Sequence, residues 1–233
     1  MNHFINLLVA EGFVRTNEPL TDQLVVHSVA GSGKSTLIRK FLEEQPLARA
    51  YTHCRADPPN LEGRFIQPFK GPCPDHFNIL DEYCKEPISA KFQVLIADPL
   101  QYRTQHLRPH YVNHKSHRLG PETCKLLSSL GIKVESHRRD RDVVTLSGIF
   151  GSPILGQAIA LDRSASDLLR AHGIQALCPI ESIGQEYPVV TVVSSEPLRN
   201  VRFKDQVYIA LSRHTEQLHV LSPEFPHTTS RPQ

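Results

Sequence analysis

The sequence predicts an α/β fold with mainly parallel sheets, and two observations carry that prediction. Short β-branched or apolar runs alternate with amphipathic segments along nearly the whole chain, as in sheets built from strand–helix–strand units. Several of the apolar runs end in an acid, which is typical of parallel strands buried on both faces. The 233 residues are enough for one large domain or two small ones with a hydrophobic core.

The first half of the chain is expected to hold two helices and four strands. Apolar residues at helical spacing predict a helix within residues 3–14 that ends at Gly12, and a second over 34–45 that stops before Pro46. Strands are expected at 23–30, 48–54, 76–83 and 91–99. Residues 55–74 carry five prolines and two glycines, so we expect this segment to be mostly loop.

The second half repeats the alternation after a basic loop. Helices are expected at 121–131, 164–173 and 202–214, and strands at 142–150, 156–162, 187–195 and 217–222. Two such runs predict two compact halves, residues 1–118 and 119–222. The tail, 223–233, is polar and proline-rich, and we expect it to be disordered.

Composition narrows the class of protein. The formal net charge is only +2, so any affinity for nucleic acid must come from a local patch, to which the 13 histidines could add as the pH falls. The five cysteines contain no C-x-x-C pair, which argues against a disulfide scaffold or a zinc ribbon and suits a reducing compartment. No apolar run approaches the roughly 18 residues of a membrane span, so the expectation is an intracellular, soluble protein.

Residues 25–40, VVHSVAGSGKSTLIRK, join an apolar strand to an amphipathic helix through a glycine-rich turn. Glycines let backbone N–H groups curl round an anion, and the helix directs its N-terminal dipole at it. In this P-loop arrangement Lys34 would reach the β- and γ-phosphates of a nucleotide, and Ser35 would offer its hydroxyl to Mg²⁺. The formula G-x-x-x-x-G-K-[ST] has glycine where this chain has Ser28. A chance match on a flexible loop is the alternative, and the flanking strand and helix argue against it.

Acidic and amide side chains follow two further apolar strands. Asp81 and Glu82 come at the end of FNILDE, where Asp81 is expected to bind Mg²⁺ and Glu82 to orient the attacking water as general base. Asp98 and Gln101 follow VLIA, and an amide there could sense the γ-phosphate. Two exposed loop acids are the alternative for the first pair, but α/β proteins bind ligands at the carboxyl ends of their strands.

Arg213 stands at the end of an expected helix near the C-terminus, in YIALSRH. Phosphoryl transfer develops negative charge on the γ-phosphate, and an arginine from a second lobe would stabilise it. A surface arginine interacting with the helix dipole is the alternative.

Six segments in order, GSGKST, LDEY, ADPLQ, SHR, SIGQEYPVVTVV and YIALSRH, resemble the motifs of viral superfamily 1 RNA helicases. The short chain, with EGFVRTNEPL and FNILDEY, is more narrowly similar to the first triple-gene-block movement proteins of filamentous plant viruses. The resemblance runs from about residue 4 to about residue 221. Ser28 and Ala97 depart from it, since helicases commonly have glycine at both positions.

The resemblance implies two RecA-like P-loop NTPase lobes with mainly parallel sheets, using ATP and Mg²⁺. The residues that match nucleotide-binding positions are Gly31, Ser32, Gly33, Lys34, Ser35, Thr36, Arg118, Gly184 and Glu186. Those that match catalytic positions are Lys34, Asp81, Glu82, Gln101 and Arg213. Ser35 and Asp81 would hold the Mg²⁺.

Family membership would further imply transport of single-stranded viral RNA through plasmodesmata and suppression of host RNA silencing. The partners it suggests are the RNA itself, further copies of this chain, the viral coat protein, other movement proteins and host silencing components. The expected locations are the host cytoplasm and plasmodesmata, with the host nucleus as a further location.

A basic stretch without acids lies between Pro99 and Pro121. Cations there could follow phosphates and aromatic rings could stack on bases, as in proteins that bind single-stranded RNA. The residues chosen for this role are Arg103, Arg108, Tyr111 and Lys115. A solvated, histidine-rich connector is the alternative.

The expectation is therefore an RNA-stimulated ATPase that serves RNA transport, with duplex unwinding left open because the chain is short for a helicase. One alternative is an RNA- and protein-binding movement and silencing factor whose weak NTPase acts as a switch. A P-loop small-molecule kinase is a remote alternative, since a kinase needs an acceptor pocket and a lid in place of a second lobe.

Overall fold

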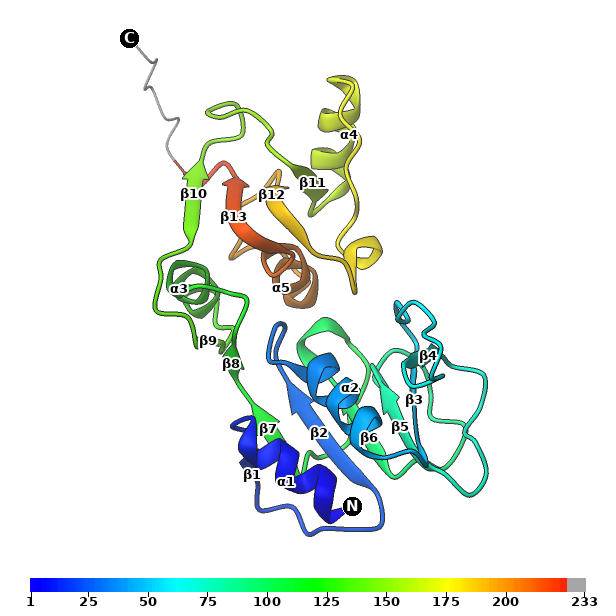
Figure 1. Cartoon of the computed structure of the whole chain (residues 1–233). Coiled ribbons are helices and arrows are strands. Elements are labelled where there is room, and N and C mark those ends of the chain that lie inside the picture. Colours follow the sequence, from blue (N-terminus) through cyan, green and yellow to red (C-terminus); the bar gives the residue numbers. More distant parts are fainter. Residues whose placement is uncertain (226–233) are drawn as a thin grey trace. The chain divides into compact units, whose positions relative to one another are not determined.

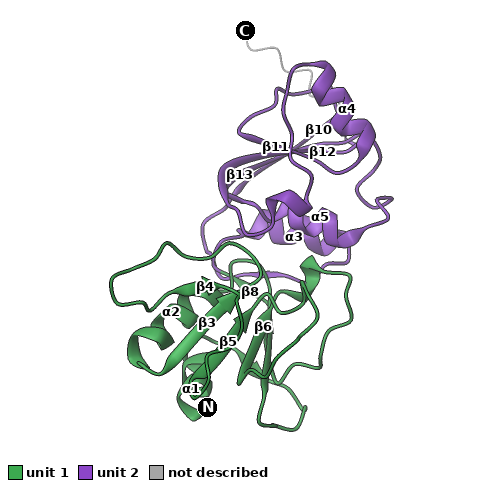
Figure 2. Cartoon of the chain, turned by 90° about the vertical axis from the view of Figure 1, so that its right-hand side faces the viewer, with its two compact units in different colours: residues 1–116 green, residues 117–233 purple. Residues whose placement is uncertain are grey.

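The computed structural model describes residues 1–225 and divides the chain into two compact units, 1–116 and 117–233 (Figure 2). The division falls at 116/117, whereas the sequence placed it at 118/119. The expected disordered tail, 223–233, lies outside the described residues from position 226 onward. An α/β architecture with mainly parallel sheets is confirmed in both units.

Unit 1 is built on a seven-stranded sheet in the order β1-β7-β2-β6-β5-β3-β4 (Figure 1). Its strands are β1 (Val14–Arg15), β2 (Leu24–Ser28), β3 (Ala48–Thr52), β4 (Ile66–Pro68), β5 (Phe77–Asp81), β6 (Val94–Ala97) and β7 (Tyr111–Asn113). All neighbours pair in parallel except β1, which is antiparallel to β7. A short strand β8 (Lys115–Ser116) ends the unit. The parallel ladder aligns the carboxyl ends of β2, β5 and β6 at one edge.

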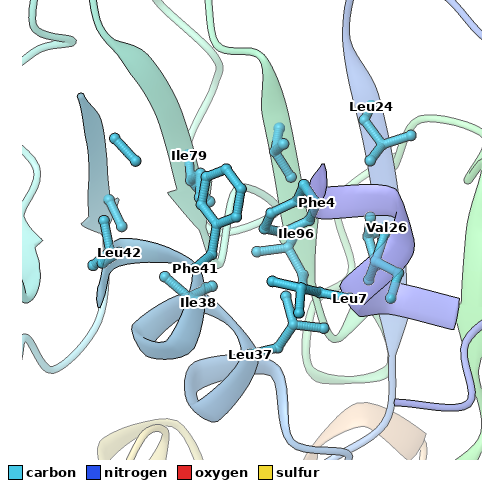
Figure 3. Packing of buried hydrophobic residues seen from close by; sticks show 14 of the residues in the cluster. Phe4, Leu7, Leu24, Val26, Leu37, Ile38, Phe41, Leu42, Ile79 and Ile96 are labelled. Carbon is cyan, nitrogen blue, oxygen red and sulfur yellow. The ribbon is translucent and has the colours of Figure 1, made fainter. Parts of the chain in front are cut away.

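Two helices cover one face of this sheet, α1 (Asn2–Ala10) and α2 (Lys34–Glu44). Alternate residues of the strands pack against the apolar sides of α1 and α2, because successive side chains of a strand point to opposite faces of the sheet. Figure 3 shows Phe41 of α2 beside Ile79 and close to Phe4, and the centres of the two phenylalanine rings are 5.0 Å apart. Burying side chains of this size stabilises by about 1.5–3 kcal/mol each.

The opposite face is covered by loop residues. Val25, Leu80 and Leu95 point to this side and pack with Tyr83 and Phe92. A 3₁₀ turn, η1 (Pro99–Gln101), directly follows β6 at the carboxyl edge. The hydrophobic core of unit 1 is thus made of two layers, one on each side of the sheet.

Unit 2 has a four-stranded, fully parallel sheet in the order β10-β13-β12-β11. The four strands of this sheet are β10 (Val143–Ser147), β11 (Gln157–Ala160), β12 (Tyr187–Val193) and β13 (His214–Leu221), and the short strand β9 (Glu135–Ser136) lies outside it. Its helices are α3 (Pro121–Ser129), α4 (Arg163–Ala171), η2 (Ile180–Ser182) and α5 (Lys204–Leu211). The Asp142 carboxylate accepts from the backbone N–H groups of Glu122 (2.8 Å) and Thr123 (3.1 Å), and so caps the first turn of α3.

The sequence missed five short strands: β1, β4 and β7 in the seven-stranded sheet and, outside it, β8 and β9. β4 lies inside the proline-rich segment 55–74, and β1 follows α1 directly. β7 lies inside the basic stretch, where the expectation was a loop, and it pairs with β2 beside the glycine-rich turn. Strands of two or three residues carry too little periodicity to be detected, and β1, β4 and β7 are fixed by their neighbours in the sheet. Within residues 1–225, no helix combines the length and the apolarity needed to cross a bilayer.

Candidate nucleotide site

The glycine-rich turn lies between the carboxyl end of β2 and the start of α2. Gly31 and Gly33 adopt positive φ angles of 72° and 90°, a backbone conformation that favours glycine. Lys34 is the first residue of α2 and is only 8% exposed. Its Nζ donates to the backbone oxygens of Ser28 (3.3 Å) and Val29 (3.4 Å), inside the curl of the turn. These features give the turn the geometry of a phosphate-binding loop.

Ser28, the departure from the P-loop formula, is the last residue of β2. The only non-glycine residues with positive φ within residues 1–225 are Asp75 and Glu82, so the Ser28 backbone does not require glycine. Its side chain is buried, and its Oγ accepts a hydrogen bond of 2.8 Å from the Ser32 hydroxyl. Serine therefore fits this position without strain and adds a contact that glycine could not make.

Two carboxyl groups stand at the end of β5. Asp81 is its last residue and Glu82 follows with a φ of 54°, an unusual conformation for a side-chain-bearing residue. Burial raises the pKa of both carboxyls, and the charge of Asp81 raises that of Glu82 further, while Lys34 acts in the opposite direction on each. Burial thus disfavours the charge on both carboxyls, and a cation at this position would stabilise their ionised forms.

The neighbouring strand β6 contributes an oriented amide. Asp98 caps η1 through the N–H of Leu100 (3.2 Å), and its other oxygen accepts from Nε2 of Gln101 (2.9 Å). Asp98 follows the VLIA strand, but its position in the sequence predicts no role for it. Because the amide nitrogen of Gln101 is engaged, the group presents its Oε1.

Two buried acceptors at this edge, Oε2 of Glu82 and Oε1 of Gln101, have no hydrogen-bond partner within residues 1–225. A buried acceptor without a donor is costly, so such groups commonly mark the place of a ligand or water. Carboxylate and hydroxyl oxygens are the ligands that Mg²⁺ prefers, and it usually keeps several waters of its own. The side chains of Asp81, Glu82 and Ser35 therefore fit a hydrated Mg²⁺ beside a nucleotide.

A histidine lies next to this site that the sequence did not single out. His27 of β2 has its Nε2 2.6 Å from the hydroxyl of Tyr83, and its ring lies 5.8 Å from that of His106. Burial, then His106, then Lys34 lower the pKa of His27 to about 4. A histidine within an apolar strand gives no signal of this kind in the sequence.

The proposed phosphate-contacting arginines belong to unit 2. Arg213 is 3% exposed, and it donates to the backbone oxygens of Ile209 (3.1 Å) and Ser182 (3.5 Å) and to the hydroxyl of Ser212 (2.9 Å). Its guanidinium is thus held by groups of its own unit. Of these three contacts, the one with Ser182 joins residues far apart in the chain, and no local sequence pattern predicts it.

Arg118 forms an ion pair with Glu186 and donates to the backbone oxygen of Ser212 (3.1 Å). Gly184 lies in a turn two residues before Glu186 and has a φ of 76°. The structure therefore brings together, within unit 2, four residues chosen from sequence: Arg118, Gly184, Glu186 and Arg213, joined through the Ser182 and Ser212 segments.

The residues chosen for RNA contact divide into two groups. Arg103, Arg108 and Lys115 are exposed, and Arg108 lies 3.9 Å from Glu18. Tyr111 is the first residue of β7 and its ring is buried in the core of unit 1, with Arg15 5.5 Å from the ring centre. A buried ring cannot stack on a base, so Tyr111 is corrected from an RNA contact to a core residue.

Comparison with known proteins agrees with this geometry. Residues 24–222 match the viral superfamily 1 RNA helicase core domain. The movement and silencing protein TGBp1 of Plantago asiatica mosaic potexvirus is 45% identical over 228 residues, which covers 97% of this chain and 99% of that protein. TGBp1 of Indian citrus ringspot virus is 35% identical over 229 residues, with 97% and 99% covered.

Solved structures show the same fold. The structure of PRRSV helicase aligns with a TM-score of 0.60 at 15% identity, over 86% of this chain and 52% of that one. The arterivirus nonstructural protein 10 helicase, solved in complex with DNA, gives a TM-score of 0.60 at 15% identity, over 86% and 60%. The chain thus spans little more than half the length of these helicases. The family match over residues 24–222 and the relatives that align over 97% of the chain show where it belongs. The chain is a member of the viral superfamily 1 RNA helicase family and, within it, of the TGBp1 movement and silencing proteins.

Proposed function

We propose that the protein is an RNA-binding ATPase that couples ATP hydrolysis to the binding and remodelling of viral RNA. The observation that carries the proposal is the carboxyl edge of unit 1. There the phosphate loop, the Asp81–Glu82 pair and the Gln101 amide stand on neighbouring strands, with two buried acceptors still open to donors. Ligand sites of parallel α/β sheets form at this edge.

The chemistry proposed for unit 1 is in-line attack of water on the γ-phosphate. Gly31–Ser35 N–H groups and Lys34 would hold the phosphates, and Mg²⁺ held through Ser35 and Asp81 would neutralise their charge. Glu82 would take the proton of the attacking water. A water donates two hydrogen bonds, so one molecule could satisfy Oε2 of Glu82 and Oε1 of Gln101 together. Since Oε1 is an acceptor, Gln101 in this orientation would contact the water and not a phosphate oxygen.

Unit 2 is proposed to supply cations to the same reaction. Arg213 would stabilise the charge that develops on the γ-phosphate, and Arg118 would contact phosphate from its place beside Glu186. For this, the Arg213 guanidinium must leave the backbone oxygens that now hold it. We therefore expect slow hydrolysis until RNA and nucleotide favour that exchange.

The exposed cations Arg103, Arg108 and Lys115 are proposed to follow the phosphates of single-stranded RNA. Replacing all three with alanine should weaken RNA binding and flatten its dependence on salt concentration. Unchanged affinity and salt slope would remove this segment from the RNA path.

At the level of the cell, the relatives named movement and silencing proteins support a role in transporting the viral genome between cells through plasmodesmata and in suppressing RNA silencing. The proposed locations are the host cytoplasm and plasmodesmata. Further copies of this chain, the viral coat protein, other movement proteins and host silencing components are the proposed protein partners.

A second candidate is an RNA- and protein-binding factor with only a weak, switch-like NTPase. It is favoured by the engagement of Lys34 and Arg213 with backbone oxygens of their own units. Phosphate release with and without single-stranded RNA, for the wild type and Lys34→Ala, separates the two. RNA-stimulated release that the variant loses supports the ATPase, whereas slow, RNA-independent release that Lys34→Ala abolishes supports the switch. Equal release from both proteins excludes hydrolysis at this site.

A further inference from the structure

We propose that the Ser28 hydroxyl is a positioning group for the phosphate loop, which it holds in the nucleotide-binding shape through Ser32. This inference rests on the proposed function of the same site. It assigns a role to the one residue of the loop that departs from the P-loop formula.

The backbone of Ser28 belongs to strand β2, so its side chain is available to hold the loop. Ser28 continues the β2 ladder and pairs in register with Asn113 of β7, and its φ is not positive. Val29 is fixed to the same partner, because its N–H donates to the Asn113 backbone oxygen at 3.1 Å. The start of the loop is therefore anchored to two strands, and a glycine here would add only flexibility.

The contact itself is short and protected from water. The Ser32 hydroxyl donates to Oγ of Ser28 at 2.8 Å, and the two residues are 2% and 4% exposed. The N–H of Ser32 also donates to the Val29 backbone oxygen at 3.3 Å. Ser32 is thus held at both its backbone and its side chain.

The consequence falls on the residues next to Ser32. Gly31 and Gly33, on either side of it, have the positive φ angles that turn their N–H groups inward. Pinning Ser32 to the rigid strand restricts both glycines to this curl before a nucleotide arrives. A loop that is ordered in advance loses less conformational entropy on binding, so affinity rises without a new contact to the ligand.

The test is a double-mutant cycle with Ser28→Ala, Ser32→Ala and both together, measured as the affinity for a fluorescent ADP·Mg²⁺ analogue. Each single variant should bind about fivefold more weakly, the worth of one hydrogen bond. The double variant should also lose about fivefold, and not the roughly 25-fold expected of independent sites, because either change alone removes the same bond. In hydrolysis, KM for ATP should rise by a similar factor while kcat stays within about twofold of the wild type.

Ser194→Ala is the matched control, because it removes another buried serine hydroxyl, one that donates to the Glu196 backbone oxygen at 2.6 Å in unit 2. It should leave nucleotide affinity unchanged. Should Ser28→Ala lower the melting temperature, Ser32→Ala alone carries the test, since it removes the same bond from within the loop. Ser28→Gly should bind no more tightly than Ser28→Ala.

Three outcomes overturn the proposal: multiplicative losses in the double variant, unchanged affinity in both single variants, or tighter binding by Ser28→Gly than by the wild type. Lys34→Ala keeps this failure distinct from failure of the proposed function. If Lys34→Ala loses nucleotide while Ser28→Ala and Ser32→Ala keep it, only the positioning role is wrong. If Lys34→Ala binds like the wild type, the loop is not the nucleotide site.

Discussion

The buried histidine beside the phosphate loop gives the sharpest prediction of pH dependence. The pKa of His27 is lowered to about 4, chiefly by burial and then by His106 and Lys34, whereas in the unfolded chain it should be near 6.5. Between these values the unfolded chain binds a proton that the folded chain does not. The free energy of unfolding must therefore fall as the pH falls below about 6.5, and this penalty is absent above it. With these two pKa values the loss at pH 5.0 is about 2 kcal/mol.

His27→Gln isolates this effect, because glutamine stays neutral and can still form a hydrogen bond with the Tyr83 hydroxyl. Urea unfolding of the full chain at pH 7.5 and 5.0, followed by circular dichroism and tyrosine fluorescence, gives the free energies. The chain has six tyrosines and no tryptophan. The wild type should lose about 2 kcal/mol more than the variant between the two pH values. Equal losses would show that His27 titrates normally and would refute the argument from burial.

Three further predictions concern other parts of the molecule. Asp142→Ala leaves the first turn of α3 without its acceptor and should cost about 2–4 kcal/mol of unfolding free energy. Asp140→Ala removes an exposed carboxyl paired with Arg138 and should cost little. Similar values for both variants would contradict the capping role of Asp142. Gly156→Ala should lower the free energy of unfolding by more than about 2 kcal/mol, because its φ is +63° and the new Cβ would lie 2.1 Å from the backbone oxygen of Val189. Gly173→Ala, at φ +72° with nothing near the new Cβ, should cost about 1 kcal/mol. Equal costs would mean that the contact with Val189 relaxes freely. Gln101→Ala should lower kcat for ATP about tenfold with little change in nucleotide affinity, and an unchanged kcat would remove Gln101 from the water-binding role.

The parts that local sequence determines were predictable. Alternating strands and helices predicted the longer strands of both sheets, and the glycine-rich turn was correctly placed between β2 and α2. The paired acids and the amide could be placed together because carboxyl ends of parallel strands share one edge. None of these inferences needed a contact between distant side chains.

The errors come from contacts between residues far apart in the chain. Tyr111 was read as an RNA contact because its neighbours are basic, yet β7 is drawn into the sheet between β1 and β2. Ser28 could not be explained from the motif, because its partner and its φ are properties of the folded loop. Asp142, the cap of α3, stands 20 residues beyond the N–H of Glu122 that it accepts from. Strand pairing and helix caps between residues far apart in the chain leave no local pattern in the sequence.

The two cations proposed for the γ-phosphate are both engaged with neutral acceptors. Lys34 donates to two backbone oxygens of its own loop, and Arg213 to two backbone oxygens and a hydroxyl of unit 2. A buried charge without partners would be strongly destabilising, so these contacts keep each unit stable before nucleotide binds. A phosphate oxygen carries negative charge, whereas a backbone oxygen is only the negative end of a dipole, so phosphate attracts each cation more strongly and can displace the backbone oxygens. Phosphate must displace fewer and on average longer hydrogen bonds at Lys34 than at Arg213. Lys34 has only two long contacts of 3.3 and 3.4 Å to give up, whereas Arg213 must release three, the shortest of 2.9 Å. Nucleotide binding through Lys34 should therefore precede, and be separable from, the engagement of Arg213 that we propose for hydrolysis.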